Sequence, residues 1–182
     1  MLLLKRNMTK TLILIRHAKS DRSDSGQKDF ERELNPRGHS DAPRMGGKLV
    51  ELGIKPNLIV SSPARRTTST AEYISEQLKY PYDDIDFQEE VYEASVRTLL
   101  KMVNELGNAH QSVAIIGHNP GFSYLAEYLT GSVIGNIPTC GIVVLEFELD
   151  NWALVSQNTA HLKNFIHPKM YDAAQEGGNY EL

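Results

Sequence analysis

The stretch TLILIRHAKS, residues 11–20, contributes more than any other segment to a prediction of the fold. Apolar or β-branched residues run without interruption into Arg16 and His17. A short, nearly continuous run of this kind is typical of a strand covered on both faces, as in a parallel sheet. We therefore expect a buried strand whose carboxyl end presents two side chains that can carry positive charge.

Similar runs recur along the chain and alternate with segments of helical periodicity. Helices are expected after Ser62 and Pro63, after Ser95, and after Pro120, because capping residues or proline precede apolar periodic segments there. The alternation predicts an α/β fold, a three-layer α/β/α sandwich with a mainly parallel central sheet. Further strands are predicted at NLIVSS, SVAIIG and GIVVLEFEL, with WALVSQ as the return arm of a hairpin.

Two segments fit this pattern less well. Residues 34–53, LNPRGHSDAPRMGGKLVELG, predict a helix that starts at Asn35 and Pro36. Pro43 falls inside that helix, where it removes a hydrogen bond and clashes with the preceding turn, so we expect a kink or a restart there. Residues 19–33, KSDRSDSGQKDFERE, are polar enough to form a mobile surface loop.

The composition indicates one globular domain, residues 1–182, in a reducing compartment. Hydrophobic residues make up 41% of the chain and the formal net charge is -4, so no overall basic field attracts nucleic acid or an anionic membrane. One cysteine, Cys140, excludes an internal disulfide and suits a buried thiol. The opening MLLLKRNMTK has only three consecutive leucines, far fewer apolar residues than a membrane span requires. We expect a cytoplasmic protein. Residues 1–8 and 170–182 are predicted to be loose tails, with Met8 as an alternative start.

Polar side chains follow three of the predicted strands. In parallel α/β sheets, ligands bind beyond the carboxyl ends of the strands, so these side chains are expected to converge on one cationic space. Each of these residues, taken singly, is as well explained as an ordinary surface residue. The inference of a binding site depends on their placement together after three strands. Arginine pairs with phosphate oxygens in a bidentate way and histidine can donate or attack, which together suit a phosphoryl group. The residues are Arg16 and His17, Arg65 and Arg66, and His118 and Asn119.

Three segments, LIRHAKS, SSPARRTTSTA and IIGHNPG, resemble in their order and spacing the signature segments of the histidine phosphatase superfamily. They are most similar to its short-chain branch, which is related to the SixA phosphohistidine phosphatases. DFERELNPRG, VYEAS and IPTCGIVVLEF resemble the same branch, so the similarity covers roughly residues 10–170. The resemblance implies a phosphoglycerate-mutase-like fold.

The resemblance also implies roles for individual residues. It makes His17 the nucleophile, Arg16 and Arg66 the phosphate clamps, and His118 the second pocket histidine. Asn119 follows His118, where it either orients the histidine or the phosphate or serves in a turn.

The choice of Arg66 over Arg65 rests on the family pattern. That pattern places its arginine four residues before a threonine-alanine pair, here Thr70 and Ala71. Arg65 is then expected to be a charge on the rim of the pocket.

The chain departs from the family pattern after the nucleophile. Many relatives carry glycine where this chain has Ala18, and acidic or small residues where it has Lys19 and Ser20. Lys19 either recruits an acidic partner or is a solvated lysine at the mouth of the pocket.

The expected chemistry needs neither metal nor cofactor. A neutral imidazole attacks phosphorus in line, and water then hydrolyses the phosphohistidine intermediate. Two arginines beside His17 lower its affinity for a proton, and an acceptor on its other ring nitrogen would fix the tautomer. No metal ligands are predicted.

Glu93, in VYEAS, is the candidate proton donor to the leaving group, because related enzymes that act on esters carry a glutamate after the corresponding segment. The alternative is a solvated carboxylate near a helix start.

We expect a metal-independent phosphatase acting on phosphohistidine in a phosphorelay protein, since the chain has no long insertion to form a lid over a small substrate. A small-molecule phosphomonoesterase is the first alternative, and a non-catalytic phosphate-binding adaptor is the second.

Overall fold

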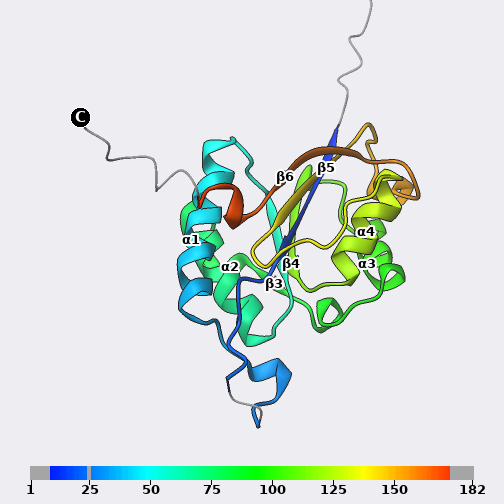
Figure 1. Ribbon diagram of the computed structural model, residues 1–182. Helices are drawn as coiled ribbons and strands as arrows, with labels where there is room; N and C mark the ends of the chain where they lie inside the picture. The colour runs from blue at the N-terminus through cyan, green and yellow to red at the C-terminus, as the bar shows by residue number, and fades with distance from the viewer. Residues whose placement is uncertain (1–8, 24–25, 173–182) are drawn as a thin grey trace, which may run out of the picture.

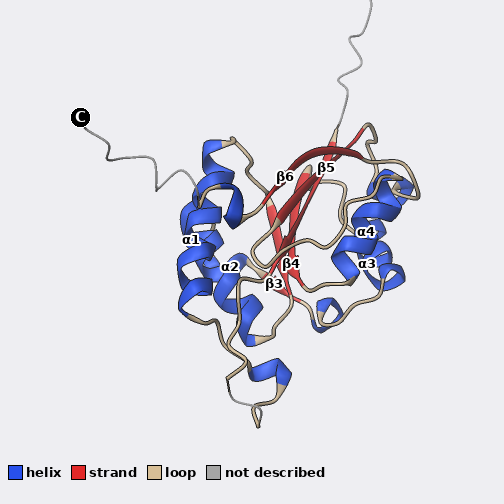
Figure 2. Ribbon diagram, in the orientation of Figure 1, coloured by secondary structure: helices blue, strands red, loops and turns tan. Residues whose placement is uncertain are grey.

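A six-stranded sheet lies between two pairs of helices in the computed structural model of the protein (Figures 1 and 2). This arrangement confirms the predicted three-layer α/β/α sandwich. The structure describes residues 9–23 and 26–172. The predicted loose tail at residues 1–8, the alternative start Met8 and residues 173–182 lie outside the described residues.

The sheet is mainly parallel, as predicted. Its strand order is β3-β2-β4-β1-β5-β6, and the first four strands in this order pair in parallel. β5 runs antiparallel to β1, and β6 runs antiparallel to β5. The strands are β1 (Lys10–Arg16), β2 (Leu58–Ser61), β3 (Asp86–Phe87), β4 (Ser112–Gly117), β5 (Ile142–Phe147) and β6 (His161–Ile166).

Each face of the sheet carries its own apolar core, because successive side chains of a strand point to opposite faces. In β1, Ile13 and Ile15 belong to the core beneath α1 and α2, whereas Leu12 and Leu14 belong to the core beneath α3 and α4. Figure 2 shows the two helix pairs on opposite sides of the strands. The helices are α1 (Pro36–Glu51), α2 (Arg65–Leu78), α3 (Val96–Asn104) and α4 (Gly121–Thr130).

Two predicted helix starts are confirmed by their capping hydrogen bonds. The side chain of Asn35 accepts a hydrogen bond from the backbone N–H of Gly38 at 2.9 Å, with Pro36 in the first turn of α1. Ser95 accepts from the backbone N–H of Thr98 at 3.1 Å.

The helix α1 continues as one helix through Pro43, so the predicted restart there is wrong. Apolar residues of α1 on both sides of Pro43 are buried in the same core, which holds the helix together across the missing hydrogen bond.

The prediction that Ser62 caps α2 is wrong. The helix begins at Arg65, and Ala64 occupies the cap position without a side-chain hydrogen bond. Ser62 lies too far before the first turn to cap it. Its hydroxyl accepts from the backbone N–H of Ala64 at 3.3 Å and lies 2.8 Å from Nε2 of His118.

The predicted return arm of the hairpin, WALVSQ, is also wrong, because Trp152–Leu154 forms a short 3-10 helix and β6 provides the return strand. Trp152 is fully buried, and its Nε1 donates to the carbonyl of His110 at 2.8 Å.

The C-terminal segment that was predicted to be loose is held against α1 where the structure describes it. Arg44 in α1 lies 2.9 Å from a carboxylate oxygen of Asp172, and Nζ of Lys48 lies 4.7 Å from the centroid of the Tyr171 ring. Residues up to 172 therefore contact the body of the domain.

No helix of the described residues is long and apolar enough to cross a membrane.

Candidate active site

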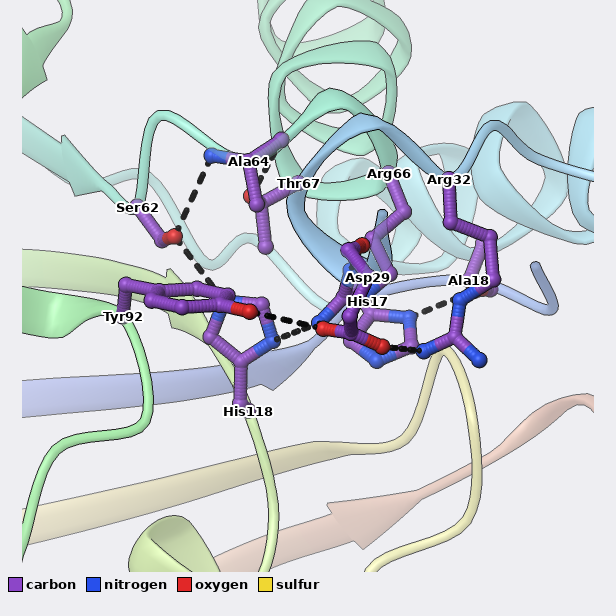
Figure 3. A network of polar contacts seen from close by, with 10 residues as sticks. All are labelled: His17, Ala18, Asp29, Arg32, Ser62, Ala64, Arg66, Thr67, Tyr92 and His118. Carbon is purple, nitrogen blue, oxygen red and sulfur yellow. Dashed lines mark hydrogen bonds and ion pairs between the residues drawn. The ribbon is translucent and has the colours of Figure 1, made fainter. Parts of the chain in front are cut away.

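The carboxyl ends of three adjacent parallel strands bring the predicted residues together. His17 follows β1, Arg66 lies in the first turn of the helix after β2, and His118 follows β4. The backbone N–H of His17 donates to the carbonyl of Gly117 at 2.9 Å, which ties the ends of β1 and β4 to one another. The imidazole rings of His17 and His118 lie 5.3 Å apart, and Figure 3 shows both beside Arg66.

His17 has one ring nitrogen bound and one free for chemistry. Its Nδ1 lies 2.7 Å from the carbonyl oxygen of Ala18, and because a carbonyl only accepts, Nδ1 carries the hydrogen. The lone pair is then on Nε2. Burial lowers the pKa of His17 to about 3, the bond to Ala18 opposes this, and the charges of His118, Arg66 and Arg16 add to it. The imidazole is therefore neutral at neutral pH, which is the condition for attack.

His118 has the opposite tautomer. Its Nδ1 lies 3.3 Å from Nη2 of Arg66, and because a guanidinium only donates, this nitrogen accepts. Its Nε2 then donates to the hydroxyl of Ser62 at 2.8 Å. Burial lowers the pKa of His118 to about 3, with the positive charge of Arg66 as the next cause.

Arg66 is buried and bound to Asp29, a residue that lies in the segment predicted to be a mobile surface loop. Nη1 of Arg66 donates to the backbone carbonyl of Asp29 at 2.5 Å, and Nη2 donates to its carboxylate at 2.8 Å. The same carboxylate accepts from the hydroxyl of Tyr92 at 2.8 Å and pairs with Arg32 at 2.5 Å (Figure 3). The segment DFERELNPRG, which contains Asp29 and Arg32, was the signal in the sequence that this loop belongs to the site.

The carboxylate of Asp29 is held in its charged form. Partial burial opposes ionisation, but hydrogen bonds from Tyr92 and Arg66 and the charges of Arg66 and Arg32 outweigh it and lower the pKa of Asp29 below its ordinary value. The buried guanidinium of Arg66 is therefore already paired with a carboxylate of the protein itself. The pair shows that this position accommodates an anion.

The other arginines differ in their surroundings. Arg16 is half-buried, and its Nη1 donates to the carbonyl of Ile137 at 2.6 Å. Its buried Nε has no hydrogen-bond partner among the residues that the structure describes. Arg65 is exposed and lies 3.5 Å from Glu33, in agreement with a place on the rim.

Asn119 is directed at the loop that precedes β5. Its Nδ2 donates to the hydroxyl of Ser123 at 2.9 Å, to the side chain of Asn136 at 2.9 Å and to the carbonyl of Ile137 at 3.1 Å. Ile137 also accepts from Arg16, so Asn119 helps to position the loop against which that arginine rests.

Glu93 is exposed and lines a cavity of about 410 Å³ that reaches His118. The cavity is also lined by Asn119, Pro120 and Tyr124. A leaving group in this cavity would contact both Glu93 and His118. Within residues 9–23 and 26–172, no cluster of three or more histidine, cysteine, aspartate or glutamate side chains is arranged to hold a metal ion.

Comparison with known proteins agrees with this geometry. The sequence profile of the histidine phosphatase superfamily (branch 1) matches residues 12–95. An uncharacterized protein of Mycobacterium tuberculosis is 30% identical over 166 residues, which are 85% of this chain and 100% of the relative. An uncharacterized chloroplastic protein of Arabidopsis thaliana is 28% identical over 154 residues, 80% of this chain and 70% of the relative.

Solved structures share the fold. The Agrobacterium tumefaciens protein named as a phosphohistidine phosphatase, SixA, superposes with a TM-score of 0.73 at 27% identity, covering 87% of this chain and 98% of that one. The protein histidine phosphatase SixA complexed with tungstate superposes with a TM-score of 0.76 at 20% identity, covering 89% and 99%.

Proposed function

Because the chain belongs to the histidine phosphatase superfamily, in its SixA-like branch, we propose that it is a metal-independent phosphatase that removes phosphate from phosphohistidine on a phosphorelay protein. The observation that carries the proposal is the state of His17. Its imidazole is neutral, its Nε2 lone pair is free, and the charges of Arg66 and Arg16 act on it. The carboxylate of Asp29 on Arg66 supports anion binding at this place.

The proposed reaction has two steps at His17. Nε2 forms a bond to phosphorus while the bond from phosphorus to the leaving nitrogen breaks, and that nitrogen keeps the electron pair and takes a proton from solvent water. The positive charge that develops on the ring of His17 is stabilised by the hydrogen bond from Nδ1 to the carbonyl of Ala18. Water then attacks phosphorus, the bond to Nε2 breaks, and the imidazole recovers its lone pair as inorganic phosphate leaves.

Arg16, Arg66 and His118 are assigned to the phosphoryl oxygens, whose charge must be stabilised in the transition state. Arg66 reaches the phosphoryl group by exchanging the Asp29 carboxylate for phosphate oxygens. A dianionic phosphoryl group beside His118 opposes the arginine charges that lower its pKa, and so favours the protonated ring that donates a hydrogen bond.

Phosphohistidine is the preferred substrate because its leaving imidazole needs little help from an acid, and because the similar SixA structures are named for this activity. Phosphate esters are the alternative, favoured by Glu93 in the cavity beside His118. The buried thiol of Cys140 suits the reducing conditions of the cytoplasm, which we propose as the location.

Parallel turnover assays on a phosphohistidine protein and on a panel of small phosphate esters, both with a chelator present, test the proposal. Faster turnover of phosphohistidine in chelator is the expected result, with the His17→Asn variant as the inactive control. Loss of all activity in chelator contradicts the metal-independent mechanism. Faster turnover of esters selects the phosphomonoesterase, and binding without turnover selects the adaptor.

A further inference from the structure

A second cleft, of about 300 Å³, adjoins the proposed phosphate site at Arg16. Its ionisable lining is entirely cationic and consists of Arg16, Lys19, Arg37 and Lys169, which together define the basic cleft. The proposed phosphate site and the basic cleft share Arg16, whose charge contributes to lowering the pKa of both His17 and His118. An anion in the basic cleft would therefore lie next to the phosphoryl group.

The four side chains come from separate parts of the chain. Arg16 ends β1, Arg37 lies in the first turn of α1, and Lys169 lies in the short 3-10 helix Pro168–Met170 after β6. Lys19 is held in place by its backbone, because its carbonyl accepts from the N–H of Asn35 at 3.0 Å. The fold thus positions all four on regular elements or on a fixed turn.

Gly38 shows how closely α1 approaches this turn. A Cβ atom at Gly38 would clash with the carbonyl oxygen of Lys19, so only glycine allows the helix to start where it does. The position of Lys19 relative to the phosphate site is therefore set by packing.

Of the four cations, only Arg37 is paired with carboxylates within the described part of the chain. It lies 3.2 Å from Asp41 and 3.5 Å from Asp172. By contrast, Lys19 and Lys169 are exposed and make no ion pair or side-chain hydrogen bond within the described part of the chain. Burial and then the charge of Arg22 lower the pKa of Arg16, so the charge of one further arginine acts on Arg16. The protein as a whole carries a net charge of -4, so this local excess of positive charge stands out against its surface.

We propose that the basic cleft binds a second anionic group of the substrate, a carboxylate or a phosphate, on the Arg16 side of the phosphoryl group. The inference rests on the proposed function and adds the substrate class to it. Two sources have the required chemistry: an acidic side chain beside the phosphohistidine of a protein, and a second acidic group on a small phosphorylated molecule. Lys19 and Lys169 then contribute to binding and leave the chemical step unchanged.

The test compares substrates with and without the second anion. One pair consists of two phosphohistidine peptides that are identical except that glutamates flanking the phosphohistidine are replaced by glutamines. The other pair consists of a small bisphosphorylated ester and its monophosphorylated counterpart. The double variant Lys19→Glu with Lys169→Glu reverses the charge of the cleft without touching Arg16.

In the double variant we expect KM for the acidic member of a pair to rise about tenfold, with kcat changed less than about twofold, because lost ion pairing weakens binding alone. The neutral member should change little. Lys55→Glu is the matched control, since this exposed lysine precedes the amino end of β2, at the opposite end of the sheet. An effect confined to the peptides identifies a protein substrate, and an effect confined to the esters identifies a small molecule.

The inference and the proposed function fail in different ways. If wild-type enzyme turns over the substrates but acidic and neutral members give the same KM in both enzymes, the basic cleft has no role and the phosphatase assignment stands. If nothing is turned over, the proposed function fails. Calorimetric binding of the two peptides to wild type and double variant then decides the inference, and equal affinities overturn it.

Discussion

The imidazole of His17 and the carbonyl oxygen of Ala18 are 2.7 Å apart, so one residue fixes the tautomer of its neighbour. A histidine that attacks phosphorus must present a nitrogen without a hydrogen, and this contact leaves Nε2 as that atom. The contact is local in sequence, but it depends on the turn after β1, where the N–H of Ala18 donates to the hydroxyl of Thr70 in α2 at 3.0 Å.

The first prediction concerns the covalent intermediate. Rapid quenching of the enzyme with a labelled substrate should trap label on Nε2 of His17 as an acid-labile, alkali-stable adduct, because a phosphorus-nitrogen bond behaves in this way. His17→Asn should give no labelled adduct and no turnover. Label on Ser62, whose hydroxyl lies beside His118, would contradict the assignment of the nucleophile.

The second prediction separates two adjacent arginines. Arg66→Ala should lower kcat/KM by about 10²- to 10³-fold, on the scale of removing one donor from a developing oxyanion, because Arg66 is buried beside His118. Arg65→Ala should change it less than about twofold, since Arg65 is exposed on the rim. Steady-state kinetics on both variants, with circular dichroism to check folding, decide the matter. A larger loss in Arg65→Ala would mean that the wrong arginine is assigned to the phosphate.

The third prediction concerns the ion pair between the carboxylate of Asp29 and the guanidinium of Arg66. Asp29→Asn should tighten competitive inhibition by inorganic phosphate about fivefold, because it removes a negative charge that competes for the guanidinium and leaves the side-chain shape unchanged. Glu33→Gln, an exposed acid near Arg65, is the matched control and should have little effect. Weaker inhibition in Asp29→Asn would show that the carboxylate organises the pocket for phosphate.

The fourth prediction concerns the leaving group. If Glu93 donates a proton, Glu93→Gln should slow hydrolysis of an alkyl phosphate by about a hundredfold and leave phosphohistidine hydrolysis nearly unchanged, because a good leaving group does not need the acid. Glu90→Gln, a nearby exposed acid, serves as the control. Equal small effects on every substrate would reduce Glu93 to a surface residue and favour phosphohistidine as the target.

The fifth prediction concerns stability and pH. His17 and His118 have a pKa of about 3 in the folded protein, below the value of about 6.5 in an unfolded chain, so the unfolded state takes up more protons as the pH falls. Stability is therefore full above about pH 6.5 and is lost towards pH 3. At pH 5 the loss should reach up to about 2 kcal/mol for each histidine.

Urea unfolding at pH 7 and pH 5 measures this loss. His118→Gln should show a smaller difference between the two pH values than the wild type, because it removes one of the two groups. A free energy of unfolding that does not change between these pH values would show that the histidines are solvated enough to protonate in the folded state.

Local rules of sequence were sufficient for most of the architecture. Branched apolar runs predicted the strands, and capping side chains such as Asn35 and Ser95 predicted helix starts, since both patterns depend on residues only a few positions apart. The convergence of Arg16, His17 and His118 also followed from sequence, because the carboxyl ends of parallel strands meet at one edge of a sheet.

Contacts between distant residues were decided only by the tertiary structure. Asp29 reaches Arg66 across 37 positions, and Ser62 reaches His118 across 56, so a local pattern assigned the first to a loop and the second to a helix cap. The predicted strand at Trp152 and the predicted helix restart at Pro43 were wrong for a related reason. Trp152 is buried in the core, and the neighbours of Pro43 in α1 are buried in the other core, so tertiary packing outweighed the local preference in both places. Sequence periodicity fixes which face of an element is apolar, whereas the partner of a polar side chain depends on which elements the fold brings within hydrogen-bond distance.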